Sequence, residues 1–207
     1  TQARLRSQGG SEAGAFLRAL PLDPETIVTP ERFNGMLRRR ARLPVPGGEL
    51  YCPSCGARLD PFGDHLASCP TTGRLKRRGT AFERAFRPLF REAPVHAREQ
   101  PLVRELILDV DPSDERQSDF YVRGLSLGHG LPVVCDAAMN AALHSDGTPH
   151  PGAATIDGVA IGRGERRKIH TEYADLATSP QIVYLVLACE EGGRWGADVF
   201  RLVKDLV

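Results

Sequence analysis

Four residues in the first half of the chain have the types and spacing of a metal site. Cys52 and Cys55 enclose two residues and, after nine more, His65 and Cys69 enclose three. A tight turn can present the first pair and one helical turn the second, so that three thiolates and an imidazole converge on zinc. The alternative, a disulfide beside a bystander histidine, leaves one cysteine without a role. We therefore predict a structural zinc ion that stabilises a segment too short for a core.

Two aspartates and a lysine in the second half form another candidate site. Asp119 begins the stretch SDFYV, and Asp136 lies within VVCDAAM after a hairpin connection, GLSLGHGLP. Neighbouring antiparallel strands bring two such carboxylates to one end of a sheet, where they can bind Mg²⁺ or Mn²⁺. Lys168, one of only three lysines, lies on the next predicted helix. The trio suits metal-assisted phosphodiester hydrolysis; the alternative is an aspartate that merely starts a strand and a solvated lysine.

Length and composition limit what can position these residues. The chain of 207 residues has the size of one domain with an appendage, or of two small domains. It is 41% hydrophobic and 26% charged, as in globular proteins, and no apolar stretch approaches 18 residues. The first ten residues, TQARLRSQGG, do not resemble a signal peptide, so we expect an excised, soluble, intracellular segment without membrane or secretory function.

Charge is divided unequally along the chain. Residues 1–100 carry 17 basic and 10 acidic residues, whereas residues 101–207 carry 10 basic and 16 acidic ones. A basic half suits phosphate contacts, and an acidic half suits divalent cations. The basic clusters comprise Arg38, Arg39, Arg40 and Arg42 before the cysteines, and Arg74, Lys76, Arg77 and Arg78 after them. They are candidates for binding nucleic acid, with a solvated basic face as the alternative.

The expected elements form a mixed α/β arrangement. Two short helices are predicted within 11–42, the second capped by Thr29 and Pro30, and an amphipathic helix is predicted over 73–92. Short apolar stretches rich in β-formers predict strands over 101–111, 118–127, 130–139 and 181–190. Helices are also predicted over 162–178 and 200–207. The order helix, three strands, helix, strand, helix indicates an α/β domain.

The order of these motifs resembles the C-terminal region of non-LTR retrotransposon proteins, which carry a zinc knuckle and a restriction-endonuclease-like domain after their reverse transcriptase. The resemblance covers about residues 45–207 and rests on Cys-x2-Cys, GDH-x3-Cys, GRLKRRG, SDFYV, VV-x-D, K-x4-Y and GG-x-WG. In the related PD-(D/E)xK nucleases the lysine follows the second acid by two residues, and here that position is Ala138.

The resemblance implies a fold and a set of roles. The fold would be a restriction-endonuclease-like mixed sheet flanked by helices (73–207), preceded by a zinc knuckle (49–72) and a helical basic linker (1–48). Cys52, Cys55, His65 and Cys69 would bind zinc; Asp119 and Asp136 would bind Mg²⁺ or Mn²⁺; Lys168 would be the displaced lysine, with Tyr173 beside it.

The implied activity is nicking of target DNA to provide the primer end for reverse transcription. The implied partners are DNA, with RNA as an alternative, and the upstream reverse transcriptase region of the same polypeptide, in a nuclear setting. Ala138 and the Ala-Ala-Met strand favour a second interpretation, an inactive nucleic-acid-binding module derived from such an element. A zinc-stabilised protein-interaction domain is a third.

Overall fold

The computed structural model describes residues 2–19, 24, 27–46, 50–108 and 110–207. The chain forms two compact units. The first comprises the chain up to Arg77 with Ala141–Ala160 and Glu190–Arg194, and the second comprises Arg78–Asn140, Ile161–Cys189 and Trp195–Val207. Two excursions from the C-terminal half therefore complete the N-terminal unit, an interleaving that the sequence does not predict. None of the helices in the described ranges has the length and apolar character needed to cross a membrane.

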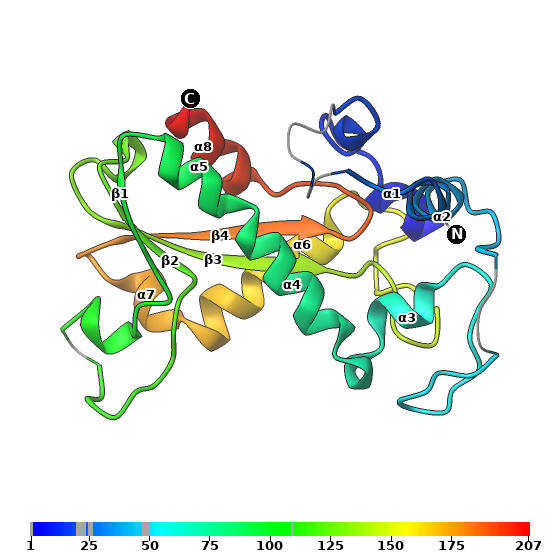
Figure 1. The fold of residues 1–207 in the computed structure, drawn as a ribbon. Coiled ribbons are helices and arrows are strands. Elements are labelled where there is room, and N and C mark those ends of the chain that lie inside the picture. The colour runs from blue at the N-terminus through cyan, green and yellow to red at the C-terminus, as the bar shows by residue number, and fades with distance from the viewer. Residues whose placement is uncertain (1, 20–23, 25–26, 47–49, 109) are drawn as a thin grey trace. The chain divides into compact units, whose positions relative to one another are not determined.

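The second unit is mixed α/β and contains a four-stranded mixed sheet flanked by helices. The strands, in their order across the sheet, are β1 (His96–Glu99), β2 (Phe120–Arg123), β3 (Val133–Asn140) and β4 (Val183–Glu190). β2 is antiparallel to both β1 and β3, and β4 lies beside β3 (Figure 1). The β2–β3 register pairs Phe120 with Cys135, which puts Asp119 opposite Asp136.

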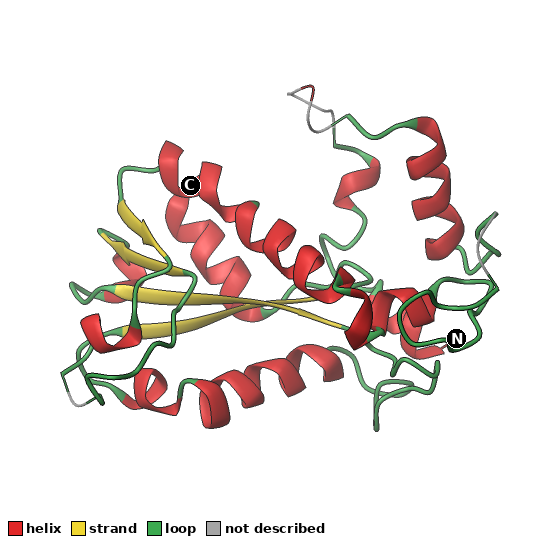
Figure 2. Ribbon diagram, turned by 60° about the horizontal axis from the view of Figure 1, so that its bottom comes forward, coloured by secondary structure: helices red, strands yellow, loops and turns green. Residues whose placement is uncertain are grey.

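Eight α-helices are found in the described ranges. They are α1 (Gln2–Ser7), α2 (Pro30–Arg40), α3 (Asp64–Ser68), α4 (Arg74–Arg84), α5 (Phe86–Glu92), α6 (Val159–Arg167), α7 (Ala174–Thr178) and α8 (Ala197–Leu206). Phe86 and Phe90 of α5 and Leu202 of α8 pack on one face of the sheet, around Phe120. Helices α6 and α7 cover the other face, as Figure 2 shows, through packing against Val134 and Val186.

One strand prediction was wrong. No strand forms in the described part of 101–111; it contains a 3-10 turn, Val103–Glu105, and the first strand is instead β1. Of the apolar residues in this stretch, Val103 and Ile107 are buried in a cluster with Tyr173 and Leu176, whereas Leu108 is exposed. β1 has no apolar alternation, because all four of its residues are exposed, so periodicity missed it.

The helix predictions were correct in part. Helix α2 begins after Thr29, whose side chain accepts the Arg32 N–H at 3.4 Å, as predicted. The predicted helix over 73–92 is divided into α4 and α5, because Pro88 has no N–H to donate to the carbonyl of Arg84. In the described part of 11–20, the predicted helix was wrong, since only a 3-10 turn, Ala15–Leu17, forms. The predicted helix over 162–178 is interrupted by the π-helical turn Lys168–Glu172.

Candidate metal centre and carboxylate site

Cys52, Cys55, His65 and Cys69 form a cluster that can hold a metal ion. Their ligand atoms all lie within 4.8 Å of one another. The Sγ atom of Cys69 is 4.0 Å from that of Cys52 and 3.8 Å from that of Cys55, and Cys55 Sγ is 3.3 Å from His65 Nε2. A tetrahedral ion with bonds of about 2.0–2.3 Å needs ligand separations of roughly 3.5–3.8 Å. The four donors therefore fit a tetrahedral site, as their spacing predicts.

A tight turn presents the first two ligands. The Cys52 N–H donates to the carbonyl of Ala57 and the Gly56 N–H to that of Cys52, at 2.8 and 2.9 Å. Gly56 closes the turn with a φ of 70°, in the left-handed region that favours glycine. Backbone N–H groups of Ser54 and Cys55 point at the Cys52 sulfur and lower the pKa of its thiol to about 6. The turn thus favours the thiolate that a metal requires.

Asp60 holds the helix that carries the histidine ligand. Its carboxylate accepts the N–H groups of Phe62, Asp64 and His65 at 2.8, 3.1 and 2.7 Å, at the start of α3. Burial acts to raise the pKa of Asp60, but these three bonds outweigh it and the pKa lies below its ordinary value. Asp60 was not predicted; an Asp four residues before a short helix was its only signal in the sequence.

The histidine ring is oriented by the excursion 141–160. His65 Nδ1 lies 2.7 Å from the carbonyl oxygen of Ser145, which assigns the proton to Nδ1 and leaves Nε2 facing the sulfurs. Metal-binding histidines are commonly oriented by such a bond. The Ser68 hydroxyl also donates to the carbonyl of His144, at 3.2 Å. Residues 141–160 therefore help to hold the histidine ligand of the cluster in position.

The basic residues before the cysteines bond to polar groups of their own unit. Arg42 donates to both carboxylate oxygens of Asp64, at 2.9 and 2.7 Å, and Arg38 donates to the carbonyl of Pro44. Arg40 donates to the carbonyls of Ala13, Gly192 and Gln8, and Arg39 lies 3.8 Å from Asp64 and 3.9 Å from Glu191. These arginines stabilise the fold through these bonds. Their binding of nucleic acid stays a prediction, because the same guanidinium groups already bond to the protein itself.

The second basic cluster lies on α4. Lys76 and Arg77 are exposed there, and Arg78 is half-buried. The side chain of Arg74, also a candidate, lies outside the described residues. Because Lys76 and Arg77 are exposed to solvent, their side chains are accessible for phosphate contacts.

In the second unit, Asp119, Asp136 and Lys168 come together on the α6–α7 face of the sheet. Lys168 Nζ is 2.6 Å from Asp136 Oδ2, and Asp136 is only 2% exposed. Just before β2, the neighbouring strand, Asp119 Oδ2 accepts the N–H of Ala137 at 2.6 Å. The hairpin register and the helix that follows β3 thus assemble three residues from distant parts of the sequence.

Charge and burial perturb all three groups. Burial, reinforced by the charge of Asp136, raises the pKa of Asp119 to about 7. Burial also raises the pKa of Asp136, although Lys168 opposes it. For Lys168, burial alone would lower the pKa, but the Asp136 carboxylate outweighs it and raises the pKa to about 12. The lysine is therefore a firmly protonated cation, and the two aspartates repel each other.

Tyr173 is held beside the lysine by the π-helical turn. The Tyr173 N–H donates to the carbonyl of Lys168 at 2.8 Å, which closes that turn, and Lys168 Nζ lies 5.2 Å from the centre of the tyrosine ring. The Tyr173 hydroxyl donates to the carbonyl of Gln117 at 2.6 Å, and burial raises its pKa to about 12. Tyr173 is thus neutral, and its hydroxyl connects the π-helical turn to the segment before β2.

Two further acids belong to this site and were not predicted. Glu172 Oε2 is 2.7 Å from Lys168 Nζ, one helical turn away, so the ammonium bridges two carboxylates. Glu83 of α4 is 8% exposed, pairs with Arg87 at 3.3 Å, and its charge adds to the raised pKa of Asp119. The i, i+4 spacing from Lys168 could have predicted the ion pair with Glu172. Nothing in the sequence indicated the burial of Glu83, since an acidic residue on an amphipathic helix is ordinarily solvated.

The carboxylate site gathers oxygen donors and negative charge around Lys168. When ionised, Asp119, Asp136 and Glu172 carry three negative charges against two positive charges, on Lys168 and on Arg167, which lies 2.9 Å from Glu172; the excess is one negative charge. Carboxylate oxygens are the ligands that Mg²⁺ and Mn²⁺ prefer. Burial and the charge of Asp136 raise the pKa of Asp119, and a cation between the aspartates would offset the repulsion between them.

The chain was also compared with known proteins. No family model matches it, and no match was found among curated proteins. What can be inferred about its function therefore rests on the two sites.

Proposed function

We propose that the chain is a divalent-metal-dependent DNA endonuclease domain with an attached zinc knuckle, similar to the C-terminal region of non-LTR retrotransposon proteins. One observation carries the proposal: Lys168 bonds to Asp136 at 2.6 Å, while Asp119, the residue before the neighbouring strand β2, lies opposite Asp136. The mixed sheet with helices on both faces is compatible with a restriction-endonuclease-like fold.

Each residue of the carboxylate site has a proposed role. Asp119 and Asp136 would hold Mg²⁺ or Mn²⁺, which when bound activates water and neutralises charge on the scissile phosphate. Lys168 stays protonated, so it would donate hydrogen bonds to a phosphate oxygen or orient water rather than remove a proton. Glu172 would keep the ammonium in place, and Tyr173 would keep the π-helical turn against the segment before β2.

Zinc is the metal we propose for the Cys3His cluster. Three thiolates and one imidazole are a donor set typical of structural zinc, and all four positions of a tetrahedron are filled by protein. A closed site leaves no position for water, so this metal would stabilise the fold without taking part in chemistry. The exposed Lys76 and Arg77 nearby in sequence would then contact phosphates.

Nicking of supercoiled plasmid tests the proposal. Zinc-loaded protein is incubated at low salt with Mg²⁺ or Mn²⁺, and wild type is compared with Asp136→Ala and Lys168→Ala. Lys204→Ala is the matched control, because Lys204 is exposed on α8 and is one of only three lysines. We expect wild type and the control to nick and both site variants to lose activity by at least two orders of magnitude.

A second candidate function, an inactive nucleic-acid-binding module, is favoured by one observation: Ala138 stands where the PD-(D/E)xK pattern has its lysine. This function predicts DNA or RNA binding that weakens steeply with salt, without nicking by any variant. That result would contradict the endonuclease proposal. Binding insensitive to salt would favour a protein-interaction domain instead.

A further inference from the structure

Strand β1 is an edge of the sheet with its outer side open. Among the strands that the structure describes, it pairs with β2 alone (Figure 1). All four of its residues are exposed. Just after the strand, the Gln100 N–H donates to the carbonyl of Asp119 at 3.0 Å. Because residues of an antiparallel strand alternate in direction, the N–H and C=O groups of Ala97 and Glu99 point away from β2. The edge therefore offers four backbone groups to another strand.

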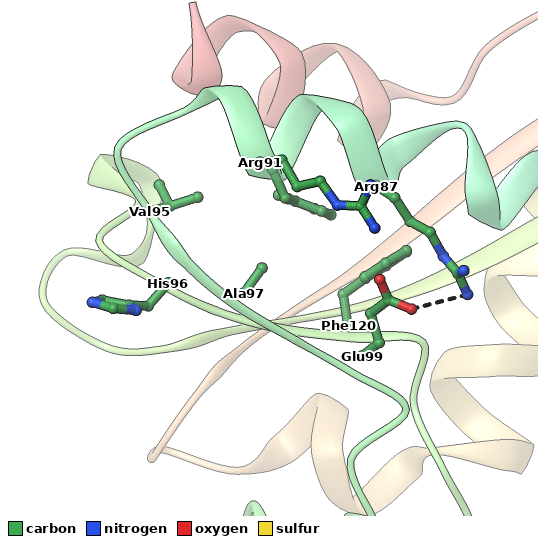
Figure 3. Close-up of a pocket in the computed structure, with 8 residues that line it drawn as sticks. Arg87, Arg91, Val95, His96, Ala97, Glu99 and Phe120 are labelled. Carbon is green, nitrogen blue, oxygen red and sulfur yellow. Dashed lines mark ion pairs between the residues drawn. The ribbon is translucent and has the colours of Figure 1, made fainter.

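Pockets flank this edge on both faces of the sheet. On the face of Ala97, a pocket of about 290 Å³ is lined by Phe90 and Phe120, with Arg87 and Arg91 of α5 above it (Figure 3). On the opposite face, a pocket of about 510 Å³ is lined by Arg98, Tyr121 and Arg123. The register places the two pockets on opposite faces of the sheet. Glu99 is paired with Phe120 on one face, and Arg98 is paired with Tyr121 on the other. Side chains of an added strand would alternate between these two pockets.

The surroundings of the edge carry an excess of positive charge. Two arginines are neutralised, since Arg87 lies 2.9 Å from Glu99 and Arg98 pairs with Glu105. Arg91 and Arg123 make no ion pair with any residue that the structure describes. Arg123 donates instead to the neutral hydroxyl of Tyr121, at 2.8 Å. The open edge is therefore complementary to an acidic strand.

A second copy of this chain is a poor occupant. Two-fold antiparallel pairing requires opposing residues to lie on one face, so β1 can be centred on Ala97 or on Arg98. The first register puts His96 opposite Arg98, and the second puts Arg98 opposite itself. Both place basic side chains directly across from each other, which is unfavourable.

We propose that the β1 edge binds an extended acidic peptide segment of a partner protein as a fifth strand. Its backbone bonds to Ala97 and Glu99, its apolar side chains enter the pocket over Phe90 and Phe120, and its acidic side chains face Arg123, which has no ion-pair partner among the described residues. This is the recognition mode known as β-strand addition, in which backbone bonds give affinity and alternating pockets give specificity. The recognised pattern is an alternation of apolar and acidic residues. The interaction is independent of the proposed nuclease.

The test uses a labelled octapeptide of alternating valine and glutamate, titrated into the zinc-loaded chain. Binding is measured by fluorescence anisotropy, and its location by amide NMR shifts. The variant Ala97→Pro removes an outward N–H that the fold does not use, and edge strands tolerate such a proline. Ala97→Val keeps the N–H and is the matched control. We expect saturable binding, shifts at Ala97 and Glu99, at least tenfold weaker binding to Ala97→Pro, and little change with Ala97→Val.

A second variant covers the case in which the proline prevents folding. Arg123→Glu keeps the strand backbone and reverses one charge, and we expect it to weaken the peptide at least fivefold. An octapeptide of alternating valine and lysine should not bind. The proposal would be overturned by equal binding of the two peptides, by shifts confined to other elements, or by absence of binding. Concentration-dependent dimerisation that Ala97→Pro abolishes would identify a second copy as the occupant and would also overturn it.

Discussion

Replacing Asp119 with asparagine should make the sheet-bearing unit more stable at neutral pH. In the wild type this carboxyl faces Asp136 and is half-buried, so its ionised form is disfavoured. Asparagine removes the charge but keeps an oxygen that can accept the N–H of Ala137. The substitution therefore removes the electrostatic destabilisation caused by the charge of Asp119 and keeps its hydrogen bond to Ala137.

The magnitude follows from the pKa of Asp119. A rise from 3.8 to about 7 corresponds, at about 1.4 kcal/mol for each pKa unit, to roughly 4 kcal/mol. Solvent screens a half-buried group, so we expect about 2–3 kcal/mol. The protonated carboxyl stabilises the folded state fully below pH 3.8, and this contribution disappears as the pH rises through about 7. The free energy of unfolding of the variant should thus equal that of the wild type near pH 4 and exceed it near pH 8.

Urea unfolding of the two proteins measures this difference. Trp195 is the only tryptophan of the chain and packs 6.0 Å from the ring of Phe82, so its fluorescence reports on the second unit. The titrations are made at pH 4.5 and pH 8 with one equivalent of zinc and no magnesium. Equal or lower stability of Asp119→Asn at pH 8, or a gain of the same size at both pH values, would refute the reasoning.

Three further predictions concern other parts of the molecule. Asp60→Ala should cost about 1–3 kcal/mol, because three N–H groups lose their acceptor, and should speed zinc loss to a chelator; an unchanged rate would contradict it. Removing the metal with a chelator should give fast hydrogen exchange over residues 50–69 while β3 remains protected, and uniform protection would argue against a structural metal. Tyr184→Phe should be neutral or stabilising by up to about 2 kcal/mol in urea unfolding, since the buried hydroxyl has no hydrogen-bond partner among the described residues; a marked loss of stability would reveal a partner.

Local signals predicted the elements that depend on nearby residues. Thr29 and Pro30 start α2 because a side-chain cap and a fixed φ act within one turn. The ligand spacing from Cys52 to Cys69 likewise predicts a cluster, since its turn and short helix are local structures. The short apolar stretches rich in β-forming residues around Asp119 and Asp136 located both strands and their antiparallel hairpin.

Features that depend on distant contacts were missed. β1 consists of exposed and mostly polar residues, and only its pairing with β2 makes it a strand. The roles of Ser145 and Glu83 come from chain segments that the fold brings in from far away. The π-helical turn at Lys168–Glu172 also depends on tertiary contacts, since the Tyr173 hydroxyl must reach the carbonyl of Gln117. No periodicity within a short window contains this information.

Binding of Mn²⁺ to the zinc-loaded chain tests the central claim most directly, that Asp119 and Asp136 hold one divalent cation. Electron paramagnetic resonance counts free Mn²⁺ during titration of the wild type, Asp136→Asn and the control Asp111→Asn, whose exposed carboxylate lies in a separate loop. We predict one bound Mn²⁺ per chain in the wild type and the control, and at least tenfold weaker binding in Asp136→Asn. Equal binding by all three proteins, or no binding by the wild type, would contradict the claim.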